Sequence, residues 1–251
     1  RYVSHRIREG KYSLPGLPAV YAQEDEAQSL EILLRDPVTG VEAVLLYGVL
    51  PECDVITRSV KIVNASQGHV SVKKLAPACL DLVGGDYDFI TFYGRHAMER
   101  NFQRMPVGHG TSKIGSLRGT SSHQYNPAVI LAERETTEDA GACYGMAFVY
   151  SGGFQSEAGR DQYSQTRLLM GLSEEQFSYP LHVGEEFQSP EVILTYSSAG
   201  IGKLSRNFHR CIREHLCRGK YKEAARPILL NTWEASYFNF TGESLLALAR
   251  Q

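Results

Sequence analysis

Residues 226–251 have the sequence RPILLNTWEASYFNFTGESLLALARQ, and this stretch decides how the rest of the chain is interpreted. The apolar run Ile228–Leu230 follows a proline and predicts a short strand buried on both faces, as strands of parallel sheets are. Trp233, the single tryptophan, stands where this strand should end, and Thr241 is the predicted N-cap of a leucine-rich helix. One strand and one helix cannot bury each other, so we expect this stretch to open a larger α/β domain.

The preceding residues, from Val20 to about Ser198, have the pattern of an antiparallel β-structure. Short apolar runs are separated by glycine, serine and asparagine, without helical spacing between them. The clearest runs are residues 55–63, 70–75, 89–93, 128–132, 143–150, 163–172 and 192–196. Many short strands joined by turns predict a mainly β fold, a large antiparallel β-sandwich. The first residues, RYVSHRIREGKY, also have the character of a strand.

The spacing of apolar residues changes from Ile201 onward to that of a helix, expected at about residues 203–217. Its predicted apolar face is made by Leu204, Phe208, Ile212 and Leu216. Gly219 is placed to end this helix. The domains expected are a β-sandwich at residues 1–200, a connector helix and linker at 201–225, and the α/β unit at 226–251.

The stretch from His96 to Pro127 interrupts the β pattern, because it is rich in Gly, Ser, Arg and His and has no clear periodicity. Long structureless segments inside a compact domain are usually functional or disordered. We therefore predict an ordered loop at an interface.

Composition excludes several classes of partner. The chain has 26 basic and 28 acidic residues, so nucleic acid is not an expected partner. No apolar run approaches the roughly 20 residues that span a bilayer, so no membrane partner is expected either. The five cysteines are an odd number at irregular spacing, which favours reduced thiols and a cytoplasmic location.

The glycine-rich run at residues 108–117 does not have the form of a phosphate-binding loop. Such a loop needs a lysine directly after its closing glycine, whereas Ser116 follows Gly115 and Lys113 precedes it. The strand and helix that should flank such a loop are also missing. No nucleotide or other cofactor is expected.

Four potential metal ligands lie on the connector helix, namely His209, Cys211, His215 and Cys217. On a helix only Cys211 and His215, four residues apart, share a face. Structural zinc sites usually take ligands from two elements. We expect no metal at this set.

Two further groups of charged residues are assigned structural roles. The basic residues of the connector region are Arg206, Arg210, Arg213, Arg218, Lys220, Lys222 and Arg226, and we expect a solvated face or salt bridges between domains. The carboxylates that invite a glycosidase interpretation are Asp81, Asp86, Asp88, Glu185 and Glu186. Gly84–Asp86 has the composition of a turn between strands, so no catalytic pair is expected here.

Three segments resemble one known family, the family-36 glycoside hydrolases, or α-galactosidases. PILLNTWEASYFNFT at residues 227–241 resembles the opening strand and loop of that family's catalytic barrel. GRHAMERNFQRMPVGHGTSKIGSLRGTSSHQYNPAVIL at residues 94–131 resembles its amino-terminal domain, and GKLSRNFHRCIREHL at residues 202–216 its helical connector. The resemblance covers essentially the whole chain, and the three segments occur in the same order as in that family.

The resemblance implies an amino-terminal β-supersandwich, a connector helix and the first βα unit of a truncated (β/α)8 barrel. It implies a retaining α-galactosidase that cleaves terminal α-galactosyl groups from sugars of the raffinose and melibiose type, and a homo-oligomer. Trp233 corresponds to a tryptophan of the galactose subsite. The nucleophile and the acid/base are expected beyond Gln251, so we expect these 251 residues alone to be inactive.

Two alternatives remain at this point. One is a stand-alone carbohydrate-binding β-sandwich without catalysis. The other is a galactosyltransferase of the raffinose-synthase type, which shares the same architecture. Chain continuation beyond Gln251 would argue against the first alternative, and product analysis with an acceptor sugar separates hydrolase from transferase.

Overall fold

The computed structural model describes residues 1–175 and 177–251 of the chain. The chain forms two compact units, Arg1–Leu216 and Cys217–Gln251. The first unit is the antiparallel β-sandwich that the sequence predicts, and this prediction is confirmed. None of the described helices is both long enough and apolar enough to span a lipid bilayer.

The main sheet has ten strands among the residues described, and all neighbouring strands are antiparallel. They are β1 Tyr2–Glu9, β2 Gln28–Arg35, β3 Glu42–Leu50, β4 Val55–Val63, β7 Tyr87–Arg95, β8 Met98–Pro106, β10 Tyr125–Glu133, β11 Cys143–Val149, β15 Glu186–Gln188 and β16 Glu191–Ser197. Their order is β1-β2-β3-β4-β16-β11-β10-β7-β8, and β15 also pairs with β4. The pairing of β4 with β16 therefore joins the beginning and the end of the sandwich sequence.

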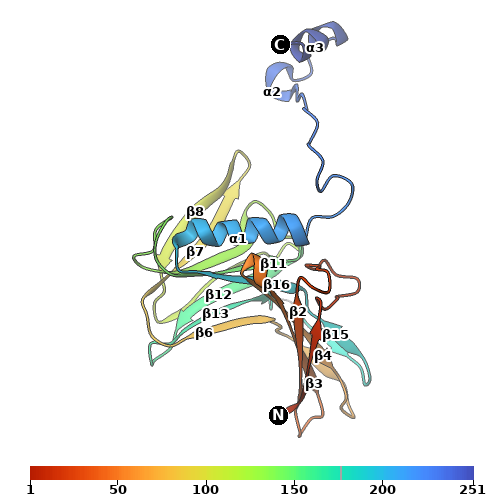
Figure 1. The fold of residues 1–251 in the computed structure, drawn as a ribbon, viewed down its shortest axis with the longest axis vertical. Helices are drawn as coiled ribbons and strands as arrows, with labels where there is room; N and C mark the ends of the chain where they lie inside the picture. Colours follow the sequence, from red (N-terminus) through yellow and green to blue (C-terminus); the bar gives the residue numbers. More distant parts are fainter. Residues whose placement is uncertain (176) are drawn as a thin grey trace. The chain divides into compact units, whose positions relative to one another are not determined.

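A smaller sheet covers part of one face of the main sheet (Figure 1). It has the order β12-β13-β6, with β12 at Phe154–Arg160, β13 at Thr166–Leu172 and β6 at Ala78–Leu82. Strand β9, Gly110–Gly115, lies beside β12. Strands β5, Val70–Val72, and β14, Tyr179–Leu181, form a separate pair.

Residues that alternate along the central strands divide the core between two faces, as the period of a strand requires. On β10 and β11, Val129, Leu131 and Met146 are buried in the core shared with the smaller sheet. Ile130 and Cys143 are buried on the opposite face. The smaller sheet contributes Phe154, Leu168 and Met170 to the shared core.

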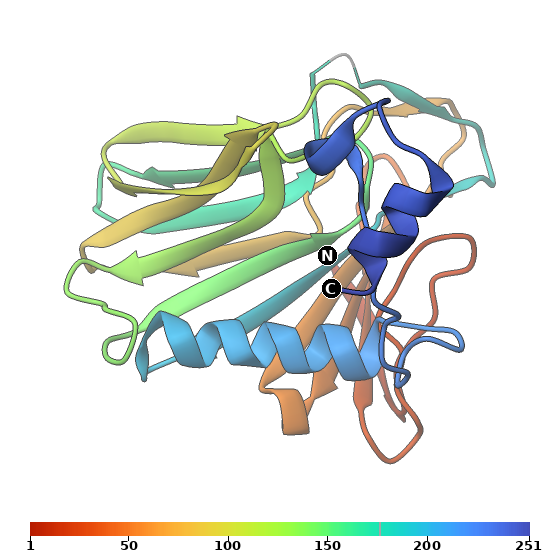
Figure 2. The ribbon, with the colours of Figure 1, turned by 90° about the horizontal axis from the view of Figure 1, so that it is seen from above.

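Helix α1, Gly200–His215, covers that opposite face of the main sheet (Figures 1 and 2). The predicted helix is confirmed, but its predicted apolar face is wrong at Ile212, which is exposed, whereas Cys211 is buried. At 3.6 residues per turn, a residue seven positions after Leu204 returns to nearly the same side of the helix, and one eight positions later is rotated by about 80°. The buried side therefore follows Leu204, Cys211 and His215.

The helix also ends at His215, before the predicted position at Gly219. The His215 backbone carbonyl accepts a hydrogen bond from the Tyr21 backbone N–H at 2.9 Å. An external donor thus satisfies a carbonyl that a longer helix would have used. Gly219, at φ +83°, lies in the turn that follows.

The prediction of an ordered loop from His96 to Pro127 is wrong, because these residues contain all of β8, all of β9 and the start of β10. Strands β7 and β8 form a hairpin with a tight turn at His96–Ala97. Phe92 and Phe102 pair across it, with ring centroids 6.0 Å apart. Strand β8 is an edge strand exposed on much of both faces, so its sequence lacks the alternation that identifies a half-buried strand.

The second unit contains two helices, α2 Trp233–Ser236 and α3 Gly242–Ala249. The prediction of α3 with Thr241 as N-cap is confirmed, and Thr241 and Ser244 form a reciprocal capping box. The predicted strand at Ile228–Leu230 is wrong, because these residues are irregular and exposed. A strand needs a neighbour for its backbone hydrogen bonds, and the described residues of this unit include no second strand.

The second unit leaves much of its apolar surface open, as we expect for a segment that opens a larger domain. Leu229 is 86 % exposed and Trp233 is 47 % exposed. Leu245 and Leu248 are half-buried.

A buried ion pair fixes the segment between β1 and β2 to the main sheet. Lys11 Nζ lies 2.5 Å from Glu191 Oε1, and the two side chains are 1 % and 0 % exposed. Glu191 Oε2 accepts the Val20 N–H at 2.7 Å. Burial lowers the pKa of Lys11, an effect that the Glu191 charge opposes.

Replacing Glu191 with glutamine should lower the free energy of unfolding by about 3–5 kcal/mol, because Lys11 is left as a buried charge without a counter-ion. Urea unfolding followed by circular dichroism measures this change. The matched control is Asp54→Asn, which removes the exposed Asp54–Lys203 pair and should cost less than about 1 kcal/mol. Equal losses from the two substitutions would contradict the importance of the buried pair.

Candidate functional site

Trp233 lies at the centre of three aromatic side chains in the second unit. Its ring centroid lies 5.2 Å from that of Tyr237 and 5.0 Å from that of Phe238, both in edge-on geometry. Such edge-to-face contacts hold aromatic rings in defined orientations. Because about half of Trp233 remains exposed, part of the indole is open to a ligand.

Short-range hydrogen bonds position this residue. The Trp233 backbone N–H donates to Asn231 Oδ1 at 2.9 Å, a local turn of the kind that asparagine favours. Tyr237, at φ +48°, ends α2 after a single turn. Contacts within residues 231–238 thus position Trp233, whereas the sequence placed it at the end of a strand that does not form.

A flat, partly exposed indole can pack against the apolar C–H face of a sugar ring. Two exposed polar side chains, Asn231 and Glu234, flank it in sequence and offer hydrogen-bonding groups. This arrangement can bind and orient a sugar.

The aspartates near the turn after β6 are each paired with an arginine. Asp81 receives two bonds from Arg167, at 2.6 and 2.9 Å. The remaining pairs are Asp86 with Arg160 at 2.7 Å and Asp88 with Arg104 at 2.6 Å. The Arg167 hydrogen bond lowers the pKa of Asp81, and the Arg160 hydrogen bond lowers that of Asp86. A general acid needs a raised pKa, so these contacts favour structural roles.

The two glutamates near β15 also make structural contacts. Glu185 Oε2 accepts the His182 backbone N–H at 2.8 Å, and Glu186 pairs with Lys61 at 3.1 Å. Gly84 and Gly85, at φ +75° and +88°, form the turn between β6 and β7 that the sequence indicates.

The glycine-rich run forms strand β9. A side chain at Gly115 would collide with the Phe154 carbonyl oxygen, which explains this glycine by close packing of backbones. Lys113 pairs with Glu175 at 2.9 Å and lies 3.6 Å from Glu174. The lysine is therefore neutralised by carboxylates, which would repel a phosphate.

The four potential metal ligands on the connector do not share a surface. His209 and Cys217 are exposed, whereas Cys211 and His215 are buried. The structure instead brings His215 close to Cys53 and Glu214, a grouping that the sequence analysis missed because Cys53 is far away in the sequence.

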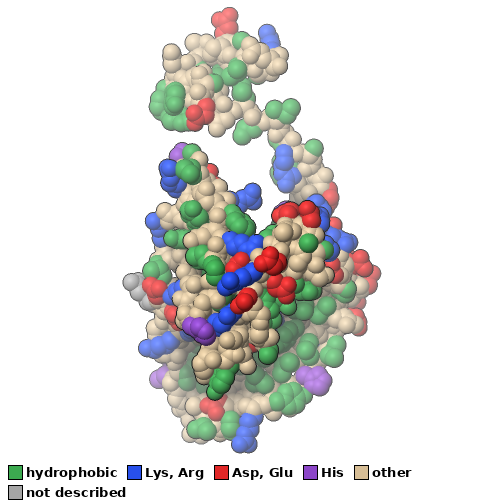
Figure 3. Space-filling view, turned by 90° about the vertical axis from the view of Figure 1, so that its left-hand side faces the viewer, with side chains coloured by type: hydrophobic (Ala, Val, Ile, Leu, Met, Phe, Trp, Pro, Cys, Tyr) green, Lys and Arg blue, Asp and Glu red, His purple; other side chains and the backbone are tan. Residues whose placement is uncertain are grey.

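Basic residues of the connector are interspersed with acidic ones. Arg210 pairs with Glu214 at 3.0 Å and with Glu52 at 3.8 Å. Lys222 lies 3.8 Å from Glu223. On the face of the first unit shown in Figure 3, Lys and Arg side chains alternate with Asp and Glu side chains, so no continuous basic surface forms there.

The succession of a β-sandwich, a connector helix and a short helical segment is also found in known glycosyl hydrolases. The model of the glycosyl hydrolase family 36 N-terminal domain matches residues 1–182, and the melibiase model matches residues 186–251. The chain therefore belongs to glycosyl hydrolase family 36.

Curated relatives support this membership over the whole chain. The bifunctional alpha-galactosidase/sucrose kinase AgaSK of Mediterraneibacter gnavus is 61 % identical over 100 % of this chain and 27 % of its own length. An alpha-galactosidase of Lactobacillus acidophilus is 42 % identical over 97 % of this chain and 34 % of its own. The chain thus spans about a third or less of these relatives.

A solved structure shows the same fold. The alpha-galactosidase AgaA of Geobacillus stearothermophilus superposes with a TM-score of 0.94 at 39 % identity, covering 100 % of this chain and 35 % of that one. A variant of AgaA has been solved in complex with raffinose.

Acrylamide should quench the fluorescence of Trp233 in the native chain nearly as well as in the urea-unfolded chain, because much of the indole is exposed. Since Trp233 is the single tryptophan, the signal reports on this site alone. A native signal that resists quenching would show that the indole is covered.

Two of the five cysteines, the exposed Cys79 and Cys217, should react with Ellman's reagent at pH 8 ahead of the buried three. Cys79 should be the slower of these two, because partial burial and the nearby Asp81 carboxylate raise its pKa. Burial raises the pKa of Cys143 to about 11 and that of Cys211 to about 12, so the reactive thiolate is scarce at these positions. The control variant Cys79→Ser should remove one fast equivalent. Three or more fast thiols in the native chain would contradict the burial described.

Proposed function

We propose that this chain is the non-catalytic amino-terminal portion of a retaining α-galactosidase that releases terminal α-galactosyl groups from raffinose- and melibiose-type sugars. One observation carries the proposal: the similarity to α-galactosidases runs in a single order through the sandwich, the connector helix and the segment around Trp233. In this role the sandwich is a scaffold, and Trp233 contacts the galactosyl group.

The catalytic carboxylates are assigned to sequence beyond Gln251. A retaining glycosidase needs two carboxyl groups about 5–5.5 Å apart on either side of the scissile bond. Asp81 and Asp86 are instead held by arginines that lower their pKa values, whereas a general acid needs a raised pKa. The reaction needs no cofactor, and none is proposed.

Residues 226–251 are proposed to become the first strand and helix of a (β/α)8 barrel. The exposure of Ile228 and Leu229 supports this, because an apolar run without a neighbour gains about 25 cal/mol for each Å² of apolar surface that further strands bury. The corresponding domain limits are residues 1–200 for the sandwich and 201–225 for the connector and linker.

The proposed protein is cytoplasmic and homo-oligomeric, and its partners are α-galactosides, with neither nucleic acid nor membrane. All five cysteines are thiols, as a reducing compartment requires. Strand β1 is an edge strand of the main sheet, with Tyr2 and Ile7 well exposed, and exposed edges favour association with a second chain.

A second candidate function, carbohydrate binding without catalysis, is favoured by a groove of about 730 Å³ on the sandwich. Tyr196, 48 % exposed, lies in this groove beside Tyr144, with ring centroids 5.0 Å apart. Asp54 and Lys203 supply polar groups at the same groove. Aromatic rings with nearby polar groups are the elements of a sugar-binding surface.

The 251-residue chain should release no nitrophenol from p-nitrophenyl α-galactoside above a heat-killed control, whereas a protein extended beyond Gln251 should release it steadily. In the extended protein, Trp233→Ala should lower kcat/KM. Loss of a contact on the order of 100 Å² at about 25 cal/mol per Å² corresponds to a decrease in kcat/KM of roughly 70-fold. Trp233→Phe should lower kcat/KM by less, because an aromatic ring remains to contact the sugar.

Controls separate the candidate functions. Tyr163→Ala removes an exposed aromatic ring of the sandwich and should leave kcat/KM unchanged. Hydrolysis by the 251-residue chain itself would contradict the proposal. An extended protein that transfers galactose to added sucrose, rather than to water, would support the galactosyltransferase alternative. Melibiose binding to the 251-residue chain that Tyr196→Ala abolishes would support the binding-module alternative.

A further inference from the structure

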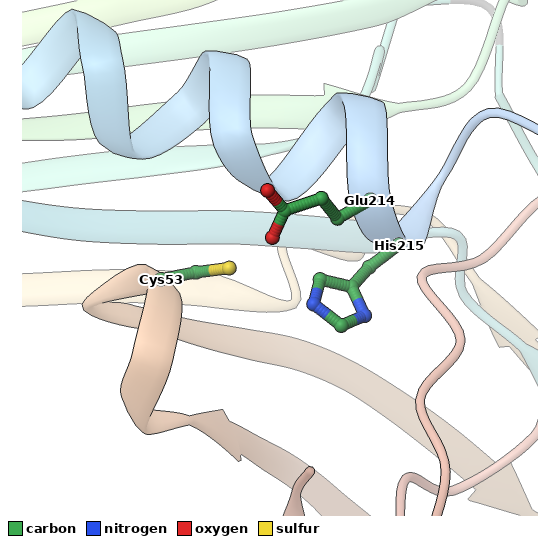
Figure 4. A group of neighbouring side chains, drawn as sticks. All are labelled: Cys53, Glu214 and His215. Atoms are coloured by element: carbon green, nitrogen blue, oxygen red, sulfur yellow. The ribbon is translucent and has the colours of Figure 1, made fainter. Parts of the chain in front are cut away.

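Three metal-ligating side chains meet where α1 ends. Cys53 belongs to the short helix η1, Pro51–Cys53, between β3 and β4, and Glu214 and His215 form the end of α1. Their ligand atoms all lie within 4.8 Å of one another. Figure 4 shows the three side chains converging from the two elements.

The orientation of His215 suits a metal ligand. Its Nδ1 lies 3.0 Å from the Tyr21 carbonyl oxygen, and because a carbonyl can only accept, Nδ1 carries the hydrogen. The lone pair is then on Nε2, and Figure 4 shows a ring nitrogen facing the side of Cys53. Metal-bound histidines usually donate their other ring N–H to a carbonyl or carboxylate in this way.

The donor set discriminates between metals. One thiolate, one imidazole and one carboxylate suit Zn²⁺, whereas Mg²⁺ and Ca²⁺ prefer oxygen ligands alone. Bonds of about 2.0–2.3 Å in a tetrahedron place donor atoms about 3.3–3.6 Å apart. The observed limit of 4.8 Å therefore requires the side chains to close by roughly 1 Å, and Glu214 would exchange its contact with Arg210 for the metal.

The charges around the three residues decide whether the local electrostatics favours a bound cation. Arg210 donates to Glu214 Oε2 at 3.0 Å and also bonds the Glu52 carbonyl oxygen, so one guanidinium faces the cluster. Arg213 lies farther from Glu214, at 3.9 Å. Against these two cations stand Glu214, Glu52, and Glu26, whose carboxylate lies 4.0 Å from His215 Nδ1. A bound thiolate would add to this negative excess.

We propose that Cys53, Glu214 and His215 bind one Zn²⁺, with water as the fourth ligand. The site shares only His215 with the four connector residues at which no metal is expected, and it takes its ligands from two elements, as structural zinc sites do. The ion would tie the turn between β3 and β4 to the end of α1. It would raise the free energy of unfolding of the sandwich by RT ln(1 + [Zn²⁺]/Kd).

The test uses the 251-residue chain freed of metal. Titration with Co²⁺ should produce a thiolate-to-cobalt absorption band at one equivalent, and Zn²⁺ should displace it. Cys53→Ser should remove the band. Zn²⁺ affinity, measured by competition with a chromophoric chelator, should fall at least about tenfold in Glu214→Gln, since even outer-sphere partners contribute about 10–100-fold. Arg210→Gln should tighten binding, because the competing cation is gone.

Matched controls are His209→Ala and Cys217→Ser, which remove exposed ligand-type residues of the same region and should change neither band nor affinity. Melting of each metal-free variant, followed by circular dichroism, shows whether it folds. If Cys53→Ser does not fold, the affinity of the Glu214→Gln variant decides the question. Absence of the band in the unmodified chain, a band that survives Cys53→Ser, or equal affinity in Glu214→Gln would overturn the proposal.

Discussion

The buried pair of Lys11 and Glu191 is the interaction on which the arrangement of the first unit depends. It joins the segment after β1 to β16, a central strand of the main sheet, and Glu191 also holds the backbone of Val20. A charge at such depth is tolerated only with its partner, so the two positions are linked. Gly48 leaves the space that the Lys11 chain occupies, since a Cβ there would collide with it.

The same segment fixes the end of the connector helix. One residue after Val20, the backbone N–H and carbonyl of Tyr21 bond to the carbonyl and Nδ1 of His215. The ion pair thus sets the position of Tyr21, and Tyr21 sets the orientation of the His215 ring beside Cys53. Helix α1 also packs on Ile193 and Val149, which hold it against the main sheet. Where the chain leaves the sandwich is therefore determined by contacts with residues near its beginning.

Ion pairs between arginine and aspartate connect the strands and loops of the sandwich. Arginines at positions 104, 160 and 167 each hold one aspartate, and these pairs join different strands or loops. The apolar surface left open is concentrated elsewhere, on Ile228, Leu229 and Trp233. The first unit therefore pairs its charges internally, whereas the second unit leaves apolar side chains uncovered.

The sequence by itself determined the features that depend on neighbouring residues. The strand character of residues 55–63, 143–150 and 192–196 follows from local periodicity, and the start of α3 follows from Thr241 and Ser244. Tertiary structure decided the rest. Strand β8 lacks a buried face and forms because β7 offers hydrogen bonds, whereas Ile228–Leu230 has strand-like residues but no strand beside it. The aromatic cluster around Trp233 was only partly foreseen, because the helix α2 replaces the expected strand end. The meeting of Cys53 with His215 was not foreseen at all, because sheet pairing and helix packing, rather than spacing along the chain, bring these two side chains together.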